Sequence, residues 1–512
     1  MTDDGHGTED TRRALILAGG GVKVAFQAGV LQVWLDEAGL RFDHADGASG
    51  GTFNLAMYCQ GMSGRQIADN WREIRPLKGV SPNWRQYPKG PYGSSLFTLD
   101  GYRRHVFPGW GLDWEKIRAT DRLATFNLYD FSRNELEVLT ADRMDEDRLA
   151  AAVSLPMWFP PVTLDGRVYI DPVYVTDANI GEAIRRGCDE LWIIWTVSGR
   201  RRWRDGFVAH YFQIIETAAN SRLQEWQRRI DASNTALREG GAGEFGRPIT
   251  VRMLQCEVPL NYLINFSRDR FRQAVELGVH RARAWCAEQG IPLSAPLPCP
   301  AVDGGRLRFS EHMAGAVTFG SSAPGTHAPH DGGPGREPLS VRLTVHIDEL
   351  DRFLVHPEHQ ATITGQIHCE ALGGRCAVES GFFNLFVEEG DPEHLRMRYR
   401  LFFTDGSGNP LTLSGCKTVD EDSGHGLWAD TTTLHTRILR GTVPPGEDAD
   451  AQVVATGVVR LRLPDLVREL ASFRIRADTP RDRLAALARF GQFFAGRLWD
   501  VYFQGALAWS PV

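Results

Sequence analysis

Residues 42–57 read FDHADGASGGTFNLAM and place one serine, Ser49, among glycines. The stretch begins as a short apolar run and continues, after the glycines, in the pattern of an apolar helix over residues 52–62. Gly47-Ala48-Ser49-Gly50-Gly51 fits G-x-S-x-G, in which small neighbours let a strained turn expose a serine hydroxyl at the end of a strand. The motif alone also fits an ordinary glycine-rich turn, and its strand-turn-helix setting favours a nucleophile.

Apolar runs and helical patterns alternate around this stretch, which indicates an α/β domain with a central, mostly parallel sheet flanked by helices. Residues 13–17 (RALIL) predict a buried strand, and residues 24–40 predict a helix that ends at Gly39. The further predicted elements are hairpins over 123–140 and 160–171, a strand over 190–197, and helices over about 205–238 and 268–289.

The strand RALIL runs into a second glycine-rich segment, Gly19-Gly20-Gly21-Val22-Lys23. A dinucleotide fingerprint needs glycine where this chain has Val24, and a P-loop needs Gly-Lys-Ser/Thr, so phosphate binding is disfavoured. Glycines bring backbone N–H groups close to a developing negative charge, and we expect an oxyanion hole for Ser49 here, with Gly50 contributing. The alternative for these glycines is a tight turn with no role in binding. For Lys23 we consider three roles: it braces the loop, it binds an anionic head group, or it is solvated.

A serine nucleophile needs a base, and no downstream histidine has an obviously helpful setting. Asp171 ends the apolar run RVYI and is followed by Pro172, so a carboxylate there could take the serine proton directly, with its pKa raised by apolar neighbours. A turn or helix cap is the alternative role for such an aspartate. Asp177 and Asn179 are predicted as caps of the helix that begins IGEAIRR.

These three pieces, in this order, resemble the patatin-like phospholipase family over about residues 13–290. The family combines a glycine-rich loop followed by Arg or Lys, a G-x-S-x-G elbow and an aspartate in a D-G-G or D-G-A turn. The resemblance implies a serine lipid acyl hydrolase, a phospholipase A, lysophospholipase or other lipid esterase. It implies a Ser49/Asp171 dyad, amides near Gly20 and Gly21 as the oxyanion hole, and no cofactor or metal.

Two departures from the family pattern concern the base and the loop. The aspartate turn here is Asp171-Pro172-Val173, and the glycine expected after Lys23 is Val24. Proline favours an extended residue before it, so Asp171 can still project toward the serine, but the usual glycine geometry is lost. These departures and the extra C-terminal half motivate the alternative of a lipid- or sterol-binding or scaffold protein with a degenerate hydrolase domain.

The composition changes after about residue 290, and the sequence predicts four parts: a polar tail over 1–12, the hydrolase domain over 13–295, a loop-rich linker over 296–338 and a β-rich domain over 339–512, which begins near 305 in an alternative division. Period-two patterns such as RMRYRLFF predict antiparallel, barrel-like strands, and residues 482–499 predict a closing helix. This half is similar to a β-rich module appended to sterol oxidases of the glucose-methanol-choline type, which implies lipid or sterol binding or a structural role.

Bulk composition narrows the partners. A net charge of −7 gives no basic footprint for nucleic acid, and no stretch approaches the roughly 18 apolar residues of a membrane span. The acidic start and scattered cysteines predict a cytoplasmic protein, and its expected partner is a lipid ester, with peripheral membrane contact compatible. Residues 81–114 are rich in aromatics, as a lid, an acyl pocket or irregular packed chain would be.

Overall fold

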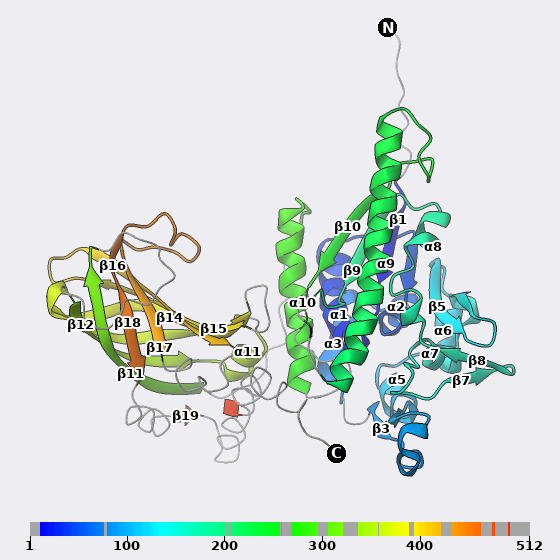
Figure 1. The fold of residues 1–512 in the computed structure, drawn as a ribbon, viewed down its shortest axis with the longest axis horizontal. Coiled ribbons are helices and arrows are strands. Elements are labelled where there is room, and N and C mark those ends of the chain that lie inside the picture. The colour runs from blue at the N-terminus through cyan, green and yellow to red at the C-terminus, as the bar shows by residue number, and fades with distance from the viewer. Residues whose placement is uncertain are drawn as a thin grey trace, which may run out of the picture. The chain divides into compact units, whose positions relative to one another are not determined.

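A computed structural model of the chain divides into two compact units, residues 1–298 and 299–512, each described by itself (Figure 1). The structure describes residues 11–491 except 76–78, 200–202, 204–205, 257, 259–267, 295–305, 321–335, 357, 389–393, 421–432, 462–473 and 477–489.

The N-terminal unit is built on an eight-stranded mixed sheet with the order β10-β9-β1-β2-β5-β8-β7, and β6 pairs with β5. The five strands from β10 to β5 run parallel, and the hairpin strands beyond them run antiparallel. The predicted α/β class with a mostly parallel sheet is confirmed. The strands are β1 (Arg13–Leu17), β2 (His44–Gly47), β5 (Ala124–Asp130), β6 (Glu135–Thr140), β7 (Val162–Leu164), β8 (Arg167–Ile170), β9 (Glu190–Trp195) and β10 (Thr250–Gln255).

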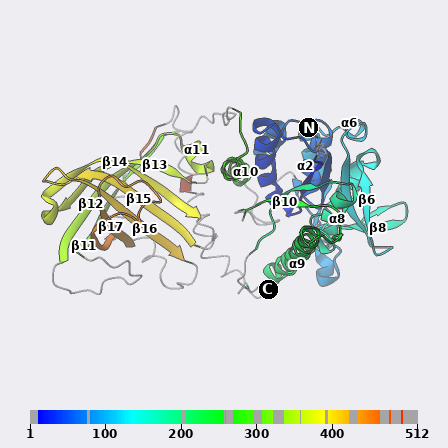
Figure 2. The ribbon, with the colours of Figure 1, turned by 90° about the horizontal axis from the view of Figure 1, so that it is seen from above.

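Helices cover both faces of this sheet because its central strands are apolar on both sides. In β1, Leu15 and Leu17 belong to one buried cluster, whereas Ala14 and Ile16 belong to another. Figures 1 and 2 show the helices around the sheet. The main ones are α1 (Ala25–Leu31), continued by the π-helical η2 (Gln32–Glu37), α2 (Gly51–Cys59), α3 (Gly64–Glu73), α7 (Glu146–Ala152), α8 (Ile180–Arg185), α9 (Phe207–Arg238) and α10 (Arg268–Glu288).

Short elements connect these layers and lie near the ends of the parallel strands. They are η1 (Gly21–Val24), the pair β3 (Ser81–Pro82) and β4 (Phe97–Thr98), η3 (Tyr87–Tyr92), η4 (Tyr102–Val106), α5 (Phe107–Gly109), α6 (Trp114–Arg118), η5 (Ala141–Arg143) and η6 (Pro172–Tyr174). The hairpin predicted to turn at Asp165-Gly166 does so, with φ of 50° and 76° at these residues, as a two-residue hairpin turn requires.

The C-terminal unit is an eight-stranded antiparallel barrel, closed because β11 pairs with both β12 and β18. Alternate residues of each strand point to an apolar core. The elements are β11 (Arg306–Phe319), β12 (Arg336–Ile347), α11 (Leu350–Val355), β13 (Gln360–Cys369), η7 (Glu370–Leu372), β14 (Gly374–Glu388), β15 (His394–Thr404), β16 (Pro410–Asp420), β17 (Thr433–Arg440), β18 (Val453–Leu461) and β19 (Arg474–Arg476), which adds to β11.

Strand β11 lies within the predicted linker over 296–338 and agrees with the alternative division, in which the β-rich domain begins near 305. Leu307, Phe309, Met313 and Val317 are buried at period-two spacing, but the Gly-, Pro- and Ser-rich runs on both sides hide this pattern in the sequence. The barrel thus begins before residue 339. The predicted closing helix over 482–499 lies almost entirely outside the described residues. No helix in the described part of the chain is long and apolar enough to cross a bilayer.

Candidate active site

Ser49 lies in the turn that joins β2 to α2. Its φ is 46°, in the left-handed region that residues with a side chain rarely adopt. The turn can be this tight because its neighbours are glycines: a Cβ on Gly50 would lie 2.3 Å from the Gly21 carbonyl oxygen, and one on Gly51 would lie 2.1 Å from that of Leu17. The serine therefore stands on a strained turn at the carboxyl end of a parallel strand, where an α/β sheet exposes it.

Asp171 meets this serine from the other side of the fold, between β8 and η6. The Ser49 hydroxyl donates to Asp171 Oδ2 at 2.7 Å, and the Val173 N–H donates to Asp171 Oδ1 at 2.9 Å. The backbone of Asp171 is extended, with φ −56° and ψ 132°, as the following Pro172 requires. The Asp-Pro-Val turn thus still directs the carboxylate at the serine.

The environment of Asp171 suits a base. Its side chain is buried, and burial raises the pKa to about 7, while the hydrogen bonds from Ser49 and the Val173 N–H act in the opposite direction. No histidine is found among the described residues that line the surrounding cavity. His44, on β2, bonds Thr125 through Nε2 instead, and burial lowers its pKa to about 4.

The glycine loop after β1 borders the same serine. Gly20 and Gly21 have φ of 142° and 56°, which side chains disfavour. Within the described residues, the N–H groups of Gly20, Gly21 and Gly50 donate no hydrogen bond, so they are free to donate to a ligand. The Gly19 N–H is engaged, because it donates to the Asp177 carbonyl oxygen at 2.9 Å.

Lys23 is buried in this loop, which corrects the alternative of a solvated side chain. Its N–H donates to the Gly20 carbonyl oxygen at 3.1 Å, so its backbone braces the loop. Val22 lines the cavity next to Ser49, whereas Lys23 is absent from its described lining. The geometry therefore gives no support for Lys23 as a head-group ligand.

Ser49 and Asp171 open into a cavity with a mostly apolar wall. Leu99 and Tyr102, from the aromatic-rich segment, are part of it, whereas Trp84 and Tyr92 from the same segment are 70% and 89% exposed. The aromatic segment thus supplies both a pocket wall and an exposed surface. The apolar wall consists of Val22, Phe53, Leu99, Tyr102, Val153, Leu155, Phe159, Val173, Val197, Phe212 and Ile215.

A third polar side chain in the cavity, Asp177, departs from its predicted role. Asn179 alone caps α8, because its Oδ1 accepts from the Glu182 N–H at 3.2 Å. Asp177 is buried, lines the cavity and has no hydrogen-bond partner on either carboxyl oxygen within the described structure. The cap prediction was wrong for Asp177 because residue spacing cannot tell a side chain that turns back to its own helix from one that points into a cavity.

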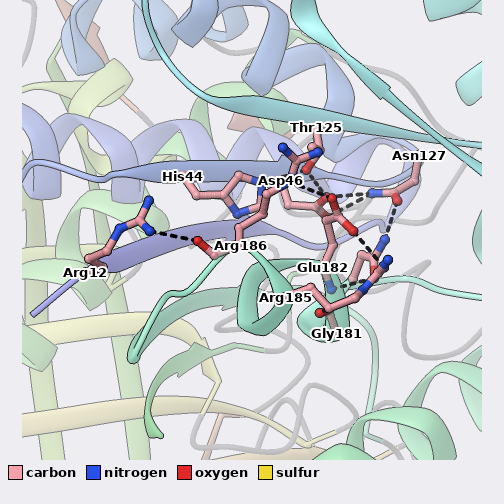
Figure 3. Close-up of polar contacts among 10 residues, drawn as sticks. Arg12, His44, Asp46, Thr125, Asn127, Gly181, Glu182, Arg185 and Arg186 are labelled. Atoms are coloured by element: carbon pink, nitrogen blue, oxygen red, sulfur yellow. Dashed lines mark hydrogen bonds and ion pairs between the residues drawn. The ribbon is translucent and has the colours of Figure 1, made fainter. Parts of the chain in front are cut away.

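A buried polar network joins the end of β2 to β5 and to the start of α8; Figure 3 labels its members Asp46, Thr125 and Asn127. Asn127 Nδ2 donates to Asp46 Oδ1 at 2.9 Å and to the Gly47 carbonyl oxygen at 2.9 Å. Asn127 Oδ1 in turn accepts from Asn179 Nδ2 at 2.7 Å. Thr125 also donates to Asp46. The end of β2 and the start of α8 are therefore held at a fixed distance by side chains.

Sequence reasoning missed this network. Asp46 directly precedes the glycine-flanked serine, and Asn127 interrupts the apolar run of β5. A polar residue inside a strand that is otherwise buried needs a partner, and this is the signal that could have found both residues.

Comparison with known proteins gives a family for part of the chain. Residues 15–184 match the family model described as patatin-like phospholipase. The matched range contains the glycine loop, the elbow and Asp171. Comparison with curated proteins finds no match. Among solved structures, the chain is similar to VipD from Legionella pneumophila, with 15% identity and a TM-score of 0.29 over 54% of this chain and 67% of that one. The match over residues 15–184 shows that the N-terminal unit contains a patatin-like phospholipase domain.

Proposed function

We propose that the N-terminal unit is a lipid acyl hydrolase that cleaves carboxylic esters with a Ser49/Asp171 dyad. The observation that carries this proposal is the 2.7 Å hydrogen bond from the Ser49 hydroxyl to a buried Asp171 carboxylate in an apolar cavity. The matched family supports the reaction class.

The reaction proceeds in two halves. Ser49 Oγ attacks the ester carbonyl carbon while its proton passes to Asp171 Oδ2, and the oxyanion receives hydrogen bonds from the free N–H groups of Gly20, Gly21 and Gly50. The intermediate collapses, the leaving alcohol takes the proton from Asp171, and the acyl group stays on Ser49. Water then attacks the acyl-enzyme, Asp171 accepts its proton, and Ser49 regains a proton as the fatty acid leaves.

The substrate class follows from the cavity wall. The apolar residues that line the cavity suit contact with an acyl chain, and burial of methylene groups against them supplies binding energy of about 0.8 kcal/mol each. Phospholipids, lysophospholipids and other lipid esters share this acyl chain.

A fluorophosphonate probe tests the dyad on the full chain. We expect labelling of Ser49, no labelling of Ser49→Ala, and turnover in Asp171→Asn reduced by about 10² to 10⁴-fold, because the serine loses its base. Fatty-acid release from phospholipids, lysolipids, acylglycerols and steryl esters identifies the preferred ester. Absence of Ser49-dependent labelling would contradict the proposal and favour a lipid-binding protein with a degenerate hydrolase domain.

We also infer that the cavity mouth contacts lipid surfaces. Large exposed apolar side chains gather in the segments that supply the cavity wall, and we call the following six the rim: Trp84, Tyr92, Leu96, Met157, Phe207 and Ile214. Large amphipathic rings such as Trp and Tyr favour the boundary between water and lipid.

Contacts join the rim segments to each other and to the cavity. The Leu96 N–H donates to the Met157 carbonyl oxygen at 2.8 Å, and the neighbouring Trp158 ring stacks on Phe212 of the cavity wall at 5.5 Å. Arg85 and Lys89 are exposed near Trp84, and residues 81–99 contain no acidic residue. This surface therefore suits anionic lipid.

A further inference from the structure

Asp177 is a buried carboxylic acid for which the dyad mechanism has no use. Its side chain is 2% exposed, it lines the cavity with Ser49 and Asp171, and neither of its carboxyl oxygens has a hydrogen-bond partner within the described residues. A buried polar group without a partner costs about 1–3 kcal/mol, so such groups are rare unless water or a ligand satisfies them. The neighbours of Asp177 indicate which part of a bound ester its carboxyl group would meet.

The side chain of Asp177 lies beside the nucleophile and the glycine loop. A Cβ built on Gly19 would be 2.0 Å from Asp177 Oδ1 and 3.0 Å from Ser49 Cβ, so these two atoms are at most about 5 Å apart. The Asp177 carbonyl oxygen accepts the Gly19 N–H, which fixes the aspartate against the loop. The carboxyl group is therefore close to the place where an ester bound at Ser49 develops negative charge.

Two buried carboxyl groups in one apolar cavity share a single negative charge near neutral pH, because a second charge would be desolvated and repelled. The hydrogen bonds decide which one carries it. Asp171 accepts from the Ser49 hydroxyl and from the Val173 N–H, whereas no side chain donates to Asp177 in the described structure and only the Gly19 N–H lies close enough to its carboxyl group to lower its pKa. Asp171 is the carboxylate, and Asp177 keeps its proton.

The surroundings support this assignment. Burial and the nearby charge of Asp171 raise the pKa of Asp177 to about 8. The other ionisable groups on neighbouring elements are Lys23 on η1, Tyr174 on η6 and Tyr211 on α9, and of all these groups only Asp171 changes the pKa of Asp177.

We propose that Asp177 is a second catalytic carboxyl, whose O–H donates a hydrogen bond to the oxyanion that forms when Ser49 attacks the ester. The inference rests on the proposed hydrolase function. A carboxylic acid kept neutral by an apolar site can stabilise an oxyanion in this way, beside backbone N–H donors. Asp177 retains its proton throughout, and the serine proton travels only to Asp171 and from there to the leaving alcohol.

The test compares Asp177→Asn, which keeps an N–H donor but cannot ionise, with Asp177→Ala, which has no donor. Turnover of a water-soluble p-nitrophenyl ester is measured from pH 6 to pH 10 on the full chain. We expect wild-type kcat to fall as pH rises through the region in which Asp177 ionises, because the carboxylate repels the oxyanion. This fall should be absent in Asp177→Asn. Asp177→Ala should lose about 10²-fold in kcat at pH 7 with little change in KM.

Glu311→Gln is the control, because Glu311 is also a buried acid but belongs to the barrel and is absent from the described cavity lining. It should keep the fall at high pH. A wild-type profile in Asp177→Asn, or wild-type kcat in Asp177→Ala, overturns the proposal, and if Asp177→Ala does not fold the profile of Asp177→Asn decides. Loss of Ser49-dependent turnover in the wild type is a different result, because it removes the hydrolase function itself.

Discussion

In the barrel, Glu311 is buried and both of its carboxylate oxygens accept from the Tyr399 hydroxyl, at 3.1 and 2.9 Å, while the Lys417 ammonium lies 5.0 Å from the centre of the same ring. In the α/β unit, Asp177 is at least as buried, and neither of its oxygens is paired in the described structure. The barrel satisfies this acid internally, whereas the α/β unit leaves its acid facing a cavity. The difference teaches that burial alone does not mark a site.

The exposed surfaces of the two units differ in the same sense. Every large hydrophobic residue that is exposed in the described chain lies in the α/β unit, and all but Phe131 belong to segments close to the cavity. The described part of the barrel has none. Within the described chain, large exposed hydrophobic residues are therefore confined to the α/β unit.

The sharpest test of this contrast replaces one group in each unit. Ser49→Ala should lower ester hydrolysis by at least about 10³-fold, because the described lining of the cavity offers no second serine, threonine or cysteine as a nucleophile. Glu311→Gln, which keeps an acceptor for Tyr399, should retain wild-type turnover. Measured kcat/KM for a soluble ester checks both variants, and equal losses in the two would contradict the assignment of the chemistry to the α/β unit.

The next largest effect on turnover is expected from the polar network of Asp46, Thr125, Asn127 and Asn179. Asn127→Ala removes the link between β2 and Asn179, and we expect kcat to fall by about 10-fold or more at nearly constant KM, because the two catalytic loops lose their fixed spacing. Asn234→Ala is the control: Asn234 is likewise bonded twice, to the backbone N–H and carbonyl of Ile249, far along α9. Similar kinetics of the two variants would mean that Asn127 only supports the fold.

Rim substitutions test the difference in surface. The quadruple variant Trp84→Ala, Tyr92→Ala, Phe207→Ala, Ile214→Ala, made on the Ser49→Ala chain, should bind phosphatidylserine-containing vesicles about 10-fold more weakly in a sedimentation assay. Phe131→Ala removes an equally large group that is 64% exposed at the β5–β6 turn, and it should bind like the parent. Unchanged binding of the quadruple variant, or a change in its oligomeric state by light scattering, would show that the rim does not serve lipid.

The smallest expected effect concerns pH and stability. Burial raises the pKa of Asp46 to about 7, so its stabilising proton is fully bound below the unfolded value near 4 and is lost as pH rises toward 7. This group alone changes the free energy of unfolding by up to about 1.4 kcal/mol per pH unit in that window. The Tm of Asp46→Asn minus the Tm of wild type should therefore be larger at pH 8 than at pH 5.

An exposed aspartate provides the control for this measurement. Asp113 caps α6, and backbone N–H groups hold its pKa below the ordinary value, so it is ionised at both pH 5 and pH 8. Asp113→Asn should change Tm equally at the two pH values. In the described barrel, Asp405 and Asp448 also have lowered pKa values, so a rise of Tm toward low pH should come from the α/β unit.

The sequence allowed prediction of those parts of the fold that depend on local pattern. The elbow, both hairpins, β9 and the two long helices could be recognised because apolar period and turn residues are local properties. Strand β11 falls within the predicted linker, and only the alternative boundary near 305 includes it, because the flanking Gly-, Pro- and Ser-rich runs dominate the composition of that segment. The likeness of the C-terminal half to a sterol-oxidase module stays a prediction.

The candidate site was accessible only in part, for a related reason. Ser49 and Asp171 each belong to a motif, so spacing could nominate them. The roles of Asp177 and Asn127 depend on residues that are distant in the sequence. Asn127, for example, contacts Asn179, which is 52 residues away. No periodicity records such long-range placement. A polar residue in an apolar strand was the one signal available.

The positive φ of Ser49 has a consequence for which nucleophiles this fold can accept. Cysteine has the same unbranched Cβ as serine and fits the left-handed backbone equally well, so a thiol enzyme is one substitution away. Threonine carries a hydroxyl too, but its branched Cβ is poorly tolerated at φ 46°. The backbone conformation therefore disfavours threonine at this position because of its shape, although its hydroxyl has the same chemistry as that of serine.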